Sequence, residues 1–343
     1  MGGRLNICCR ALAPDMTLAK GQPGTVKILK SGESNFHYGG LMVCGSVWVC
    51  PICASKITER RRVELAQGVE NWLSGGHGVS LLTLTVPHYA KNSLQTVLDG
   101  LTDAFRRMMK GKPWKRVSEQ IVLVGRVRTL EVTHGPNGWH PHFHILLFTE
   151  SPLDSVDLLH LADALLIQWQ SSALAAGLPK PNHHGLTLQD GSEAARYVSK
   201  WGIDHEMTKG HLKQGVKAGH VSPFGLLEIA ADQEPGYEKV VPLFREYGKA
   251  FKGKRQLVWS DGLRGLLGLG QELTDEEIAT SEEEKATLFF KIPLNVWKIV
   301  LQKERRGELL NVCENGLDAL HDYLIELMDV YIPEEFAQDE APF

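Results

Sequence analysis

Residues 134–148 read HGPNGWHPHFHILLF, and this stretch decides the fold that we expect. Its second half is an apolar run typical of a β-strand, in which side chains two residues apart point to the same face of a sheet. His142 and His144 therefore share a face. The Asn-Gly pair at 137–138 is a strong signal for a β-hairpin. We predict two antiparallel strands, at residues 121–133 and 140–148.

Two imidazoles on one strand face suit a divalent cation and leave positions open for water or substrate. The alternative, in which they serve core or hairpin packing, is costly because each needs a buried partner. We expect a third ligand from the neighbouring strand: Glu131 first, with His140 and His134 as alternatives. Pairing about the turn sets residue 131 near 143, on the wrong face, so we expect a bulge or longer loop to aim Glu131 at the cation.

A second motif, EAARYVSK, follows at residues 193–200. In a helix it brings Glu193, Tyr197 and Lys200 onto one face. Tyr197 is the candidate nucleophile; its phenol needs positive charge from Lys200 or the cation in order to react as phenolate. Glu193 is placed to activate a water molecule. Its alternative role is an ordinary acidic residue in a first helical turn, where the helix dipole favours it.

The remaining hydrophobic patterns predict an α+β fold. We expect helices at 57–72, 94–109, 153–176 and 192–201, the last with Ser192 as its cap, and strands at 79–85 and 184–189. The order is strand, helix, hairpin, helix, strand, helix. This order favours an antiparallel sheet covered by helices on one side.

Five of the six cysteines lie before residue 54, and they mark an N-terminal module. A Cys-x-x-Cys turn lets two thiolates reach one tetrahedral Zn²⁺ ion, and Cys50 and Cys53 form such a turn, with Cys44 nearby. Cys9 is our expected fourth ligand, ahead of Cys8 and His37. The competing interpretation is a set of buried apolar cysteines.

Charge is distributed unevenly along the chain. Residues 271–343 carry 18 acidic and 6 basic side chains, whereas residues 1–270 carry a net charge of +8. A positive body is a plausible phosphate-binding surface, although solvated helix faces have the same composition. The candidate DNA-binding residues are Arg106, Arg107, Lys110, Arg126, Arg128 and Arg196.

We predict four regions from these patterns. They are a zinc-binding module (1–60), a catalytic domain (61–215), a mixed extension of it (216–270) and an acidic helical C-terminal region (271–343). No run of about eighteen apolar residues occurs, so we expect no membrane span, and we expect a soluble cytoplasmic protein of bacterial type.

Three motifs together resemble those of HUH endonucleases, and more closely the rolling-circle plasmid replication initiators (Rep proteins) of the single-tyrosine branch. They are Leu82-Thr-Leu-Thr85, His140-Pro-His-Phe-His144 and Tyr197-Val-Ser-Lys200, in the order expected of the family. The resemblance covers residues 40–265 when the cysteines and the segment 256–263 are included.

This resemblance implies a five-stranded antiparallel catalytic sheet and a defined chemistry. His142 and His144 would hold Mg²⁺ or Mn²⁺, and Tyr197 would nick one strand of origin DNA, remaining on the 5′ phosphate and freeing a 3′-OH for a host polymerase. Lys200 would assist at the phosphate. The cycle would end by strand transfer, as expected of an endonuclease that is also a strand transferase, or by hydrolysis assisted by Glu193. The partners implied are single-stranded DNA and the double-stranded origin.

Some features depart from the family or leave alternatives open. No second tyrosine lies near Tyr197, and no P-loop segment occurs, so a host helicase would have to unwind the duplex, recruited through residues 271–343 in one interpretation. The alternatives are an HUH transposase, a non-catalytic zinc-containing origin-binding protein and a generic metal hydrolase. Both a monomer and a dimer remain open.

Overall fold

The computed structural model describes residues 6–13, 25–31, 35–200, 220–233, 237–281 and 286–328, with the side chains of Ser199, Lys200 and Tyr237 outside the description. The chain divides into two compact units. One unit is Val47–Leu273, and the other combines Met1–Ser46 with Thr274–Phe343. Separate roles are predicted from the sequence for residues 1–60, 61–215, 216–270 and 271–343. This division stays a prediction.

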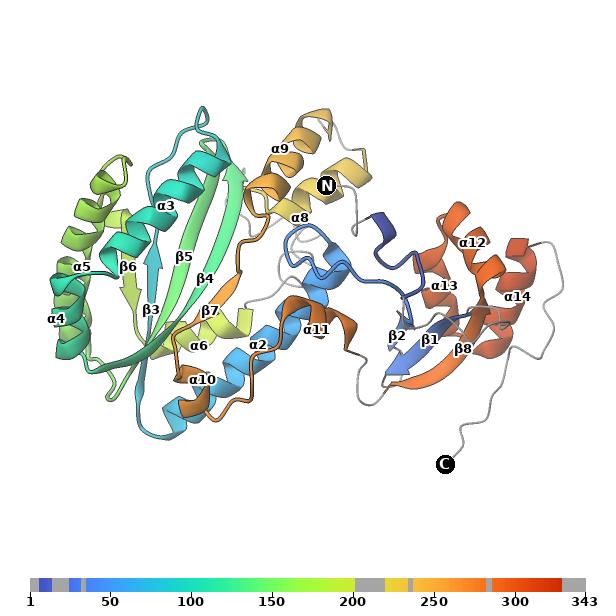
Figure 1. The fold of residues 1–343 in the computed structure, drawn as a ribbon, viewed down its shortest axis with the longest axis horizontal. Coiled ribbons are helices and arrows are strands. Elements are labelled where there is room, and N and C mark those ends of the chain that lie inside the picture. Colours follow the sequence, from blue (N-terminus) through green and yellow to red (C-terminus); the bar gives the residue numbers. More distant parts are fainter. Residues whose placement is uncertain are drawn as a thin grey trace. The chain divides into compact units, whose positions relative to one another are not determined.

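The larger unit is built on a five-stranded sheet (Figure 1). Its strand order is β6 (Leu186–Gln189), β3 (Gly78–Leu84), β5 (Gly138–Thr149), β4 (Leu123–Gly135) and β7 (Leu257–Trp259). All neighbouring strands pair antiparallel. The α+β class and the five-stranded antiparallel sheet are confirmed.

Helices pack on both faces of this sheet. On one face, Val198 of α6 (Gly191–Lys200) joins a buried cluster that includes Leu146 of β5 and residues of α2 (Pro51–Ser74). On the other face, the ring of Phe105 in α3 (Leu94–Met108) lies 4.9 Å from that of Phe143 in β5. The expectation of helices on one side is wrong, because β5 is apolar on both of its faces and both need cover.

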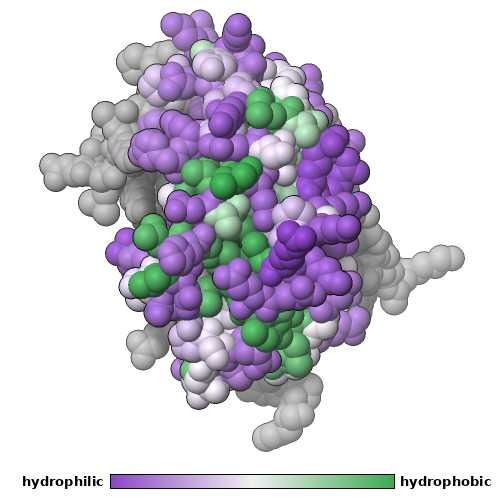
Figure 2. All heavy atoms as spheres, turned by 90° about the vertical axis from the view of Figure 1, so that its left-hand side faces the viewer, coloured by the Kyte–Doolittle hydropathy of each residue, from purple (hydrophilic) through white to green (hydrophobic). Residues whose placement is uncertain are grey.

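Other helices complete this unit: α4 (Lys112–Gln120), α5 (Ser155–Ala175), the short η2 (His183–Gly185), α8 (Pro223–Ala231), α9 (Tyr237–Ala250) and α10 (Leu263–Leu266). α5 begins at Asp154, whose carboxylate accepts from two backbone N–H groups. Its outer face exposes Val156, Leu159, Ile167 and Leu174. Figure 2 views the side on which α4 and α5 lie in Figure 1 and shows hydrophobic patches among hydrophilic residues. None of the helices described is both long and apolar enough to cross a membrane.

The second unit has its own sheet and core. The sheet has the order β2 (Asn35–Gly39), β1 (Thr25–Ser31) and β8 (Thr287–Pro293), and its helices are α11 (Asp275–Thr280), α12 (Leu294–Gln302), α13 (Arg306–Cys313) and α14 (Leu317–Met328). Trp297 is fully buried in a cluster that joins side chains of β1, β8 and the three helices α12, α13 and α14. Its indole N–H donates to the carbonyl oxygen of Arg10 at 2.7 Å.

This pairing changes how the acidic C-terminal region is understood. β8 pairs antiparallel with β1, with Ile28 opposite Phe290 and Val26 opposite Ile292. Deleting residues 271–343 would therefore remove the partner strand and most of the core of the N-terminal strands. Such a deletion cannot separate a helicase-recruiting role from a folding role.

Replacing the core tryptophan tests this arrangement. Trp297→Ala should lower the free energy of unfolding by about 3–5 kcal/mol, because a fully buried indole leaves a cavity. The matched control is Leu288→Ala in β8, where the side chain is 42% exposed and the loss should be below about 1 kcal/mol. Urea unfolding of both variants gives the comparison, and equal losses would contradict the described core.

Candidate active site

A two-residue turn sets the geometry of the candidate site. β4 and β5 pair so that Gly135 lies opposite Gly138, which leaves Pro136 and Asn137 as the turn. Gly138 has a φ of +86°, a left-handed conformation that L side chains rarely adopt. The Asn-Gly signal thus locates the hairpin correctly.

The same turn decides which residues face each other. Glu131 lies directly opposite His142, and Thr129 lies opposite His144. The predicted pairing of residue 131 with 143, corrected by a bulge, is wrong, because the turn contains two residues instead of centring on Asn137. Directly opposed residues of an antiparallel pair share a face, so Glu131 reaches the histidines from a regular strand.

Glu131, His142 and His144 converge in space. Glu131 Oε2 lies 3.6 Å from His142 Nε2 and 3.7 Å from His144 Nε2. One ligand atom from each residue lies within 4.8 Å of those of the other two. Two imidazole nitrogens and a carboxylate form a donor set that accepts several divalent cations. The structure therefore brings together the three residues predicted as catalytic-metal ligands.

The hydrogen bonds of the two imidazoles orient their Nε2 atoms toward the common centre. His142 Nδ1 lies 3.2 Å from the carbonyl oxygen of His140, which only accepts, so Nδ1 carries the proton. His144 Nδ1 lies 2.8 Å from Thr83 Oγ1. An imidazole that donates its Nδ1 proton in such a bond leaves Nε2 as a metal ligand.

Tyr197 lies beside this centre. Its hydroxyl donates to Glu131 Oε1 at 2.5 Å, and its ring centroid is 4.6 Å from that of His144. The predicted nucleophile and the predicted cation ligands, about fifty residues apart in the chain, are therefore in contact. α6 is held in this position by Ala194 and Val198, which are buried in the cluster on the same face of the sheet.

Thr129 supports Tyr197 from β4. The two hydroxyl oxygens are 2.6 Å apart, and Thr129 is buried. The hydroxyl of Tyr197 has one proton and donates it in the hydrogen bond to Glu131. The hydroxyl of Thr129 is therefore the donor in its bond to the phenolic oxygen. Thr83 and Thr129 were not among the predicted site residues. Thr83 belongs to the Leu82-Thr-Leu-Thr85 motif, and Thr129 lies two residues before Glu131, so the alternation of strand faces was the available signal.

The ionisation of the site suits a cation. Burial opposes the charge of Glu131, but His144, His142 and the Tyr197 hydroxyl outweigh it and lower the pKa of this carboxyl to about 2. Burial lowers the pKa of His144 to about 4, so its ring is neutral at pH 7. Burial, together with the Glu131 carboxylate, raises the pKa of Tyr197 well above its usual value. A negative carboxylate and a neutral imidazole, as found for Glu131 and His144, are the protonation states in which such groups bind metals.

The alternative third ligands lie outside this group. His140 Nδ1 is 3.2 Å from His88 Nδ1, and burial lowers the pKa of His140 to about 3. The ring of His134 packs edge-on against Trp139, with centroids 4.9 Å apart. Neither of the two joins the close set formed by Glu131, His142 and His144.

The helix that carries Tyr197 differs from the expectation at its start. Asp190, and not Ser192, provides the cap: its Oδ1 accepts from the backbone N–H groups of Ser192 at 2.9 Å and Glu193 at 3.3 Å. Glu193 is half-buried and forms an ion pair with Arg196 at 3.0 Å. Lys200 ends the helix, and its side chain lies outside the described residues.

Most of the predicted DNA-binding residues lie on the other face of the sheet. Arg128 is opposite Ile145, one residue from the His144 position, so it faces away from the site. Its guanidinium lies 4.7 Å from the ring centroid of Phe143. Burial lowers the pKa of both Arg126 and Arg128.

The candidates on α3 belong to the same distant face. Arg106 and Arg107 both pair with Asp103, at 2.5 and 2.7 Å. Lys110 follows this helix in the chain and is exposed. Of the six candidates, Arg196 alone shares the helix of Tyr197. Their contact with DNA stays a prediction.

Four cysteines form a second candidate metal group. The Sγ atoms of Cys8, Cys44, Cys50 and Cys53 lie within 4.8 Å of one another. The fourth member is Cys8, the alternative, where Cys9 was expected. The reason is local, because Cys9 packs against the hydrophobic cluster around Trp297, whereas Cys8 Sγ accepts from the backbone N–H of Cys44 at 3.4 Å. His37, the other alternative, is not in the group. Four thiolates at this spacing could bind Zn²⁺.

Thr83 offers a test of the site that leaves every metal ligand in place. Thr83→Val should weaken Mn²⁺ binding by about 10-fold or more, because His144 loses the hydrogen bond that orients it. Thr83→Ser keeps a hydroxyl and should bind Mn²⁺ nearly as the parent does. Isothermal titration gives both constants. Equal affinity of the Val and Ser variants would show that Thr83 does not orient the ligand.

Comparison with known proteins gives matches to replication proteins. Residues 42–153 match the family model described as Rep_1, replication protein. A "Protein rep" of Streptomyces lividans is 28% identical over 295 residues, covering 67% of this chain and 64% of the relative. A "Protein rep" of Bacillus amyloliquefaciens is 30% identical over 107 residues, covering 29% of each chain.

Another curated relative carries a different name. A "Neomycin resistance protein" of Streptomyces cyanogenus is 32% identical over 133 residues, covering 32% of this chain and 30% of the relative. The chain thus spans less than two thirds of the length of each curated relative named here. No solved structure matches.

Proposed function

We propose that this chain, whose residues 42–153 match the Rep_1 replication protein model, initiates rolling-circle replication of a bacterial plasmid by nicking one DNA strand. Tyr197 is the nucleophile in this proposal, and Glu131, His142 and His144 hold the divalent cation, Mg²⁺ or Mn²⁺. The observation that carries it is the contact between nucleophile and ligand set, with Tyr197 Oη 2.5 Å from Glu131 Oε1.

The chemistry follows from this contact. The phenolic oxygen attacks the phosphorus and loses its proton, the bond from phosphorus to the 3′ oxygen breaks, and that oxygen takes up a proton. The products are a 5′-phosphotyrosine and a free 3′-OH. A bound divalent cation would supply a Lewis acid that polarises a phosphodiester oxygen.

The protein's own groups position the reacting oxygen. Thr129 and Glu131 hold Tyr197 Oη from two sides, at 2.6 and 2.5 Å. Burial and the Glu131 carboxylate raise the pKa of the phenol, so positive charge is needed nearby before it reacts as phenolate. A divalent cation held by Glu131, His142 and His144 would supply such charge, and Lys200 would assist at the phosphate.

Glu193 is proposed to end the cycle. It lies one helical turn before Tyr197 on α6 and retains partial exposure, so it can reach a water molecule near the phosphotyrosine. Its ion pair with Arg196 joins partly exposed side chains, and such pairs are weak enough to open. Hydrolysis would release the DNA from the tyrosine.

The remaining parts fit the same proposal. The four-cysteine group would hold a structural Zn²⁺ ion, and the six predicted basic residues would contact DNA. A host polymerase would extend the 3′-OH, and a host helicase would unwind the duplex. We expect this to take place in the bacterial cytoplasm, where thiols stay reduced.

The nucleophile is tested by trapping the covalent product. Incubation with Mn²⁺ and single-stranded oligonucleotides tiled over the replicon should give a protein–DNA adduct on a denaturing gel. Tyr197→Phe should abolish this adduct, because it removes the attacking oxygen. Tyr89→Phe is the matched control, since Tyr89 is 53% exposed and lies outside the site. An adduct that survives in Tyr197→Phe would refute the assignment.

Termination is tested separately by the lifetime of the adduct. Glu193→Gln should still nick but should release DNA by hydrolysis about 100-fold more slowly, the usual lower range of general base catalysis. Glu119→Gln, an exposed change on α4, is the control. If the adduct decays at the same rate in both variants, Glu193 is an ordinary residue of the first helical turn.

A further inference from the structure

A row of basic side chains runs along α9 and the turn that follows it. Arg245, Lys249 and Lys252 are all exposed. Their spacing of four and three residues places them on one side of the helix and its extension. We call these three residues the basic stripe. Among the described residues, no ion pair or hydrogen bond involves any of the three side chains.

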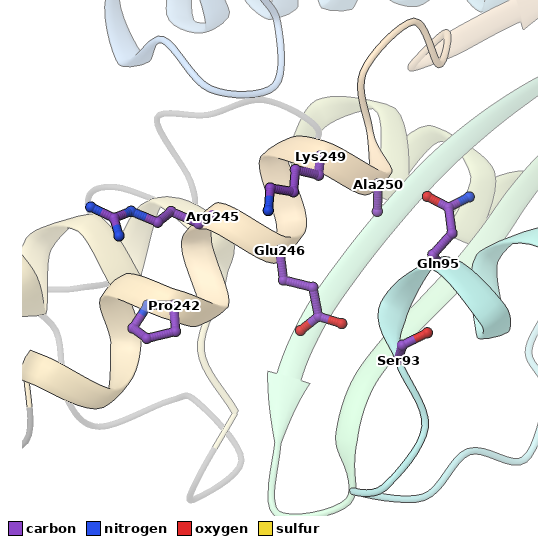
Figure 3. Close-up of a pocket in the computed structure, with 7 residues that line it drawn as sticks. All are labelled: Ser93, Gln95, Pro242, Arg245, Glu246, Lys249 and Ala250. Carbon is purple, nitrogen blue, oxygen red and sulfur yellow. The ribbon is translucent and has the colours of Figure 1, made fainter. Parts of the chain in front are cut away.

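The basic stripe borders a cleft between α9 and the start of α3. The cleft has a volume of about 410 Å³ and is lined by Ser93, Gln95, Pro242, Arg245, Glu246, Lys249 and Ala250. Figure 3 shows Glu246 pointing toward the start of α3, while Arg245 and Lys249 extend to the other side of α9. The exposed cations thus form a rim of the cleft.

The nearby carboxylates are already engaged by other donors. Glu246 accepts from the backbone N–H of Leu94 at 2.8 Å and from the indole N–H of Trp139 at 2.9 Å. Asp99 accepts from Gln95 at 2.8 Å and lies 3.5 Å from the ammonium of Lys254. The positive charge of the stripe is therefore available to an external anion.

The helix that carries the basic stripe contacts the strand that carries the predicted cation ligands. Glu246 lies next to Arg245 in α9 and binds Trp139 of β5. Trp139 precedes His142 by three residues, which is about 10 Å along a strand. Trp139 and His142 point to opposite faces of the sheet, so the stripe lies beside the hairpin on the face away from Tyr197.

The chemistry of the cleft favours duplex DNA as the occupant. Proteins that bind single strands stack the bases on aromatic side chains. The seven residues that line the cleft include no aromatic one. Exposed Lys and Arg side chains beside a cleft without an aromatic lining match contacts to the phosphates of a duplex, which presents one charge per about 1.7 Å of its axis. By contrast, Arg106 and Arg107 on α3 share the carboxylate of Asp103.

We propose that Arg245, Lys249 and Lys252 bind the phosphate backbone of the duplex that flanks the nick. This inference rests on the proposed function. It assigns duplex contact to α9, a surface absent from the predicted set of DNA-binding residues, and leaves the handling of the scissile single strand to the face that carries Tyr197.

The test compares two triple variants of the full chain. One is Arg245→Ala/Lys249→Ala/Lys252→Ala, and the matched control is Lys112→Ala/Lys115→Ala/Arg116→Ala, which removes the same charge from exposed positions on α4. The probes are a fluorescent mixed-sequence duplex of about thirty base pairs, roughly three helical turns, and a single strand of the same sequence. Binding is measured by anisotropy at several salt concentrations, and adduct formation is measured on the tiled single strands.

The stripe variant should bind the duplex at least about 10-fold more weakly, with a log–log salt slope smaller by about 2.7, or about 0.9 for each phosphate that the variant no longer neutralises. The control variant should keep both values, and both variants should still form the adduct. Unchanged duplex binding in the stripe variant, or equal losses in both variants, would overturn the proposal. Equal loss of single-strand binding and of duplex binding would assign the stripe to the single strand and would also overturn it. Absence of an adduct in the parent protein would count against the proposed function alone.

Discussion

The register of the β4–β5 hairpin is the constraint on which the site depends. The turn of Pro136 and Asn137 puts Glu131 opposite His142 and Thr129 opposite His144. A slip by one residue would move every side chain of a strand to the other face. Glu131 would then face α3, and the two histidines would lose the carboxylate that completes their donor set. A glycine with a left-handed backbone, Gly138, helps to fix this register.

The same face of the sheet provides both the core and the chemistry. Along β5 the side chains at 142 and 144 are imidazoles, whereas Leu146 and Phe148 on that face belong to the buried cluster. Val198 of α6 packs into this cluster, and its neighbour Tyr197 reaches the polar end of the face, where it contacts Glu131. Apolar packing thereby positions the phenol next to the charged group. Sites built on strands and helices hold such geometry more precisely than sites on loops.

The sequence predicted what strong local patterns encode. Alternation identified β3, β4 and β5, and residue type indicated His142, His144 and Tyr197, which the structure brings together. The exact register was missed, because one residue in a turn decides it. The short β7 and the pairing of β8 with β1 were missed as well, since partners about 130 and 260 residues apart in the chain leave no local signal. The cysteine group contains Cys8 instead of the predicted Cys9 for a similar reason. Tertiary packing places the side chain of Cys9 against the hydrophobic cluster.

We propose that Glu131, His142 and His144 bind one divalent cation beside Tyr197. The most direct test of this site is pulsed electron paramagnetic resonance of the protein loaded with one equivalent of Mn²⁺. We predict couplings from two directly bound imidazole nitrogens, one of which disappears in His142→Ala and the other in His144→Ala, while Glu131→Gln weakens Mn²⁺ binding because it removes the only charged ligand. A Mn²⁺ signal without nitrogen couplings, or one unchanged in these variants, would contradict this metal site.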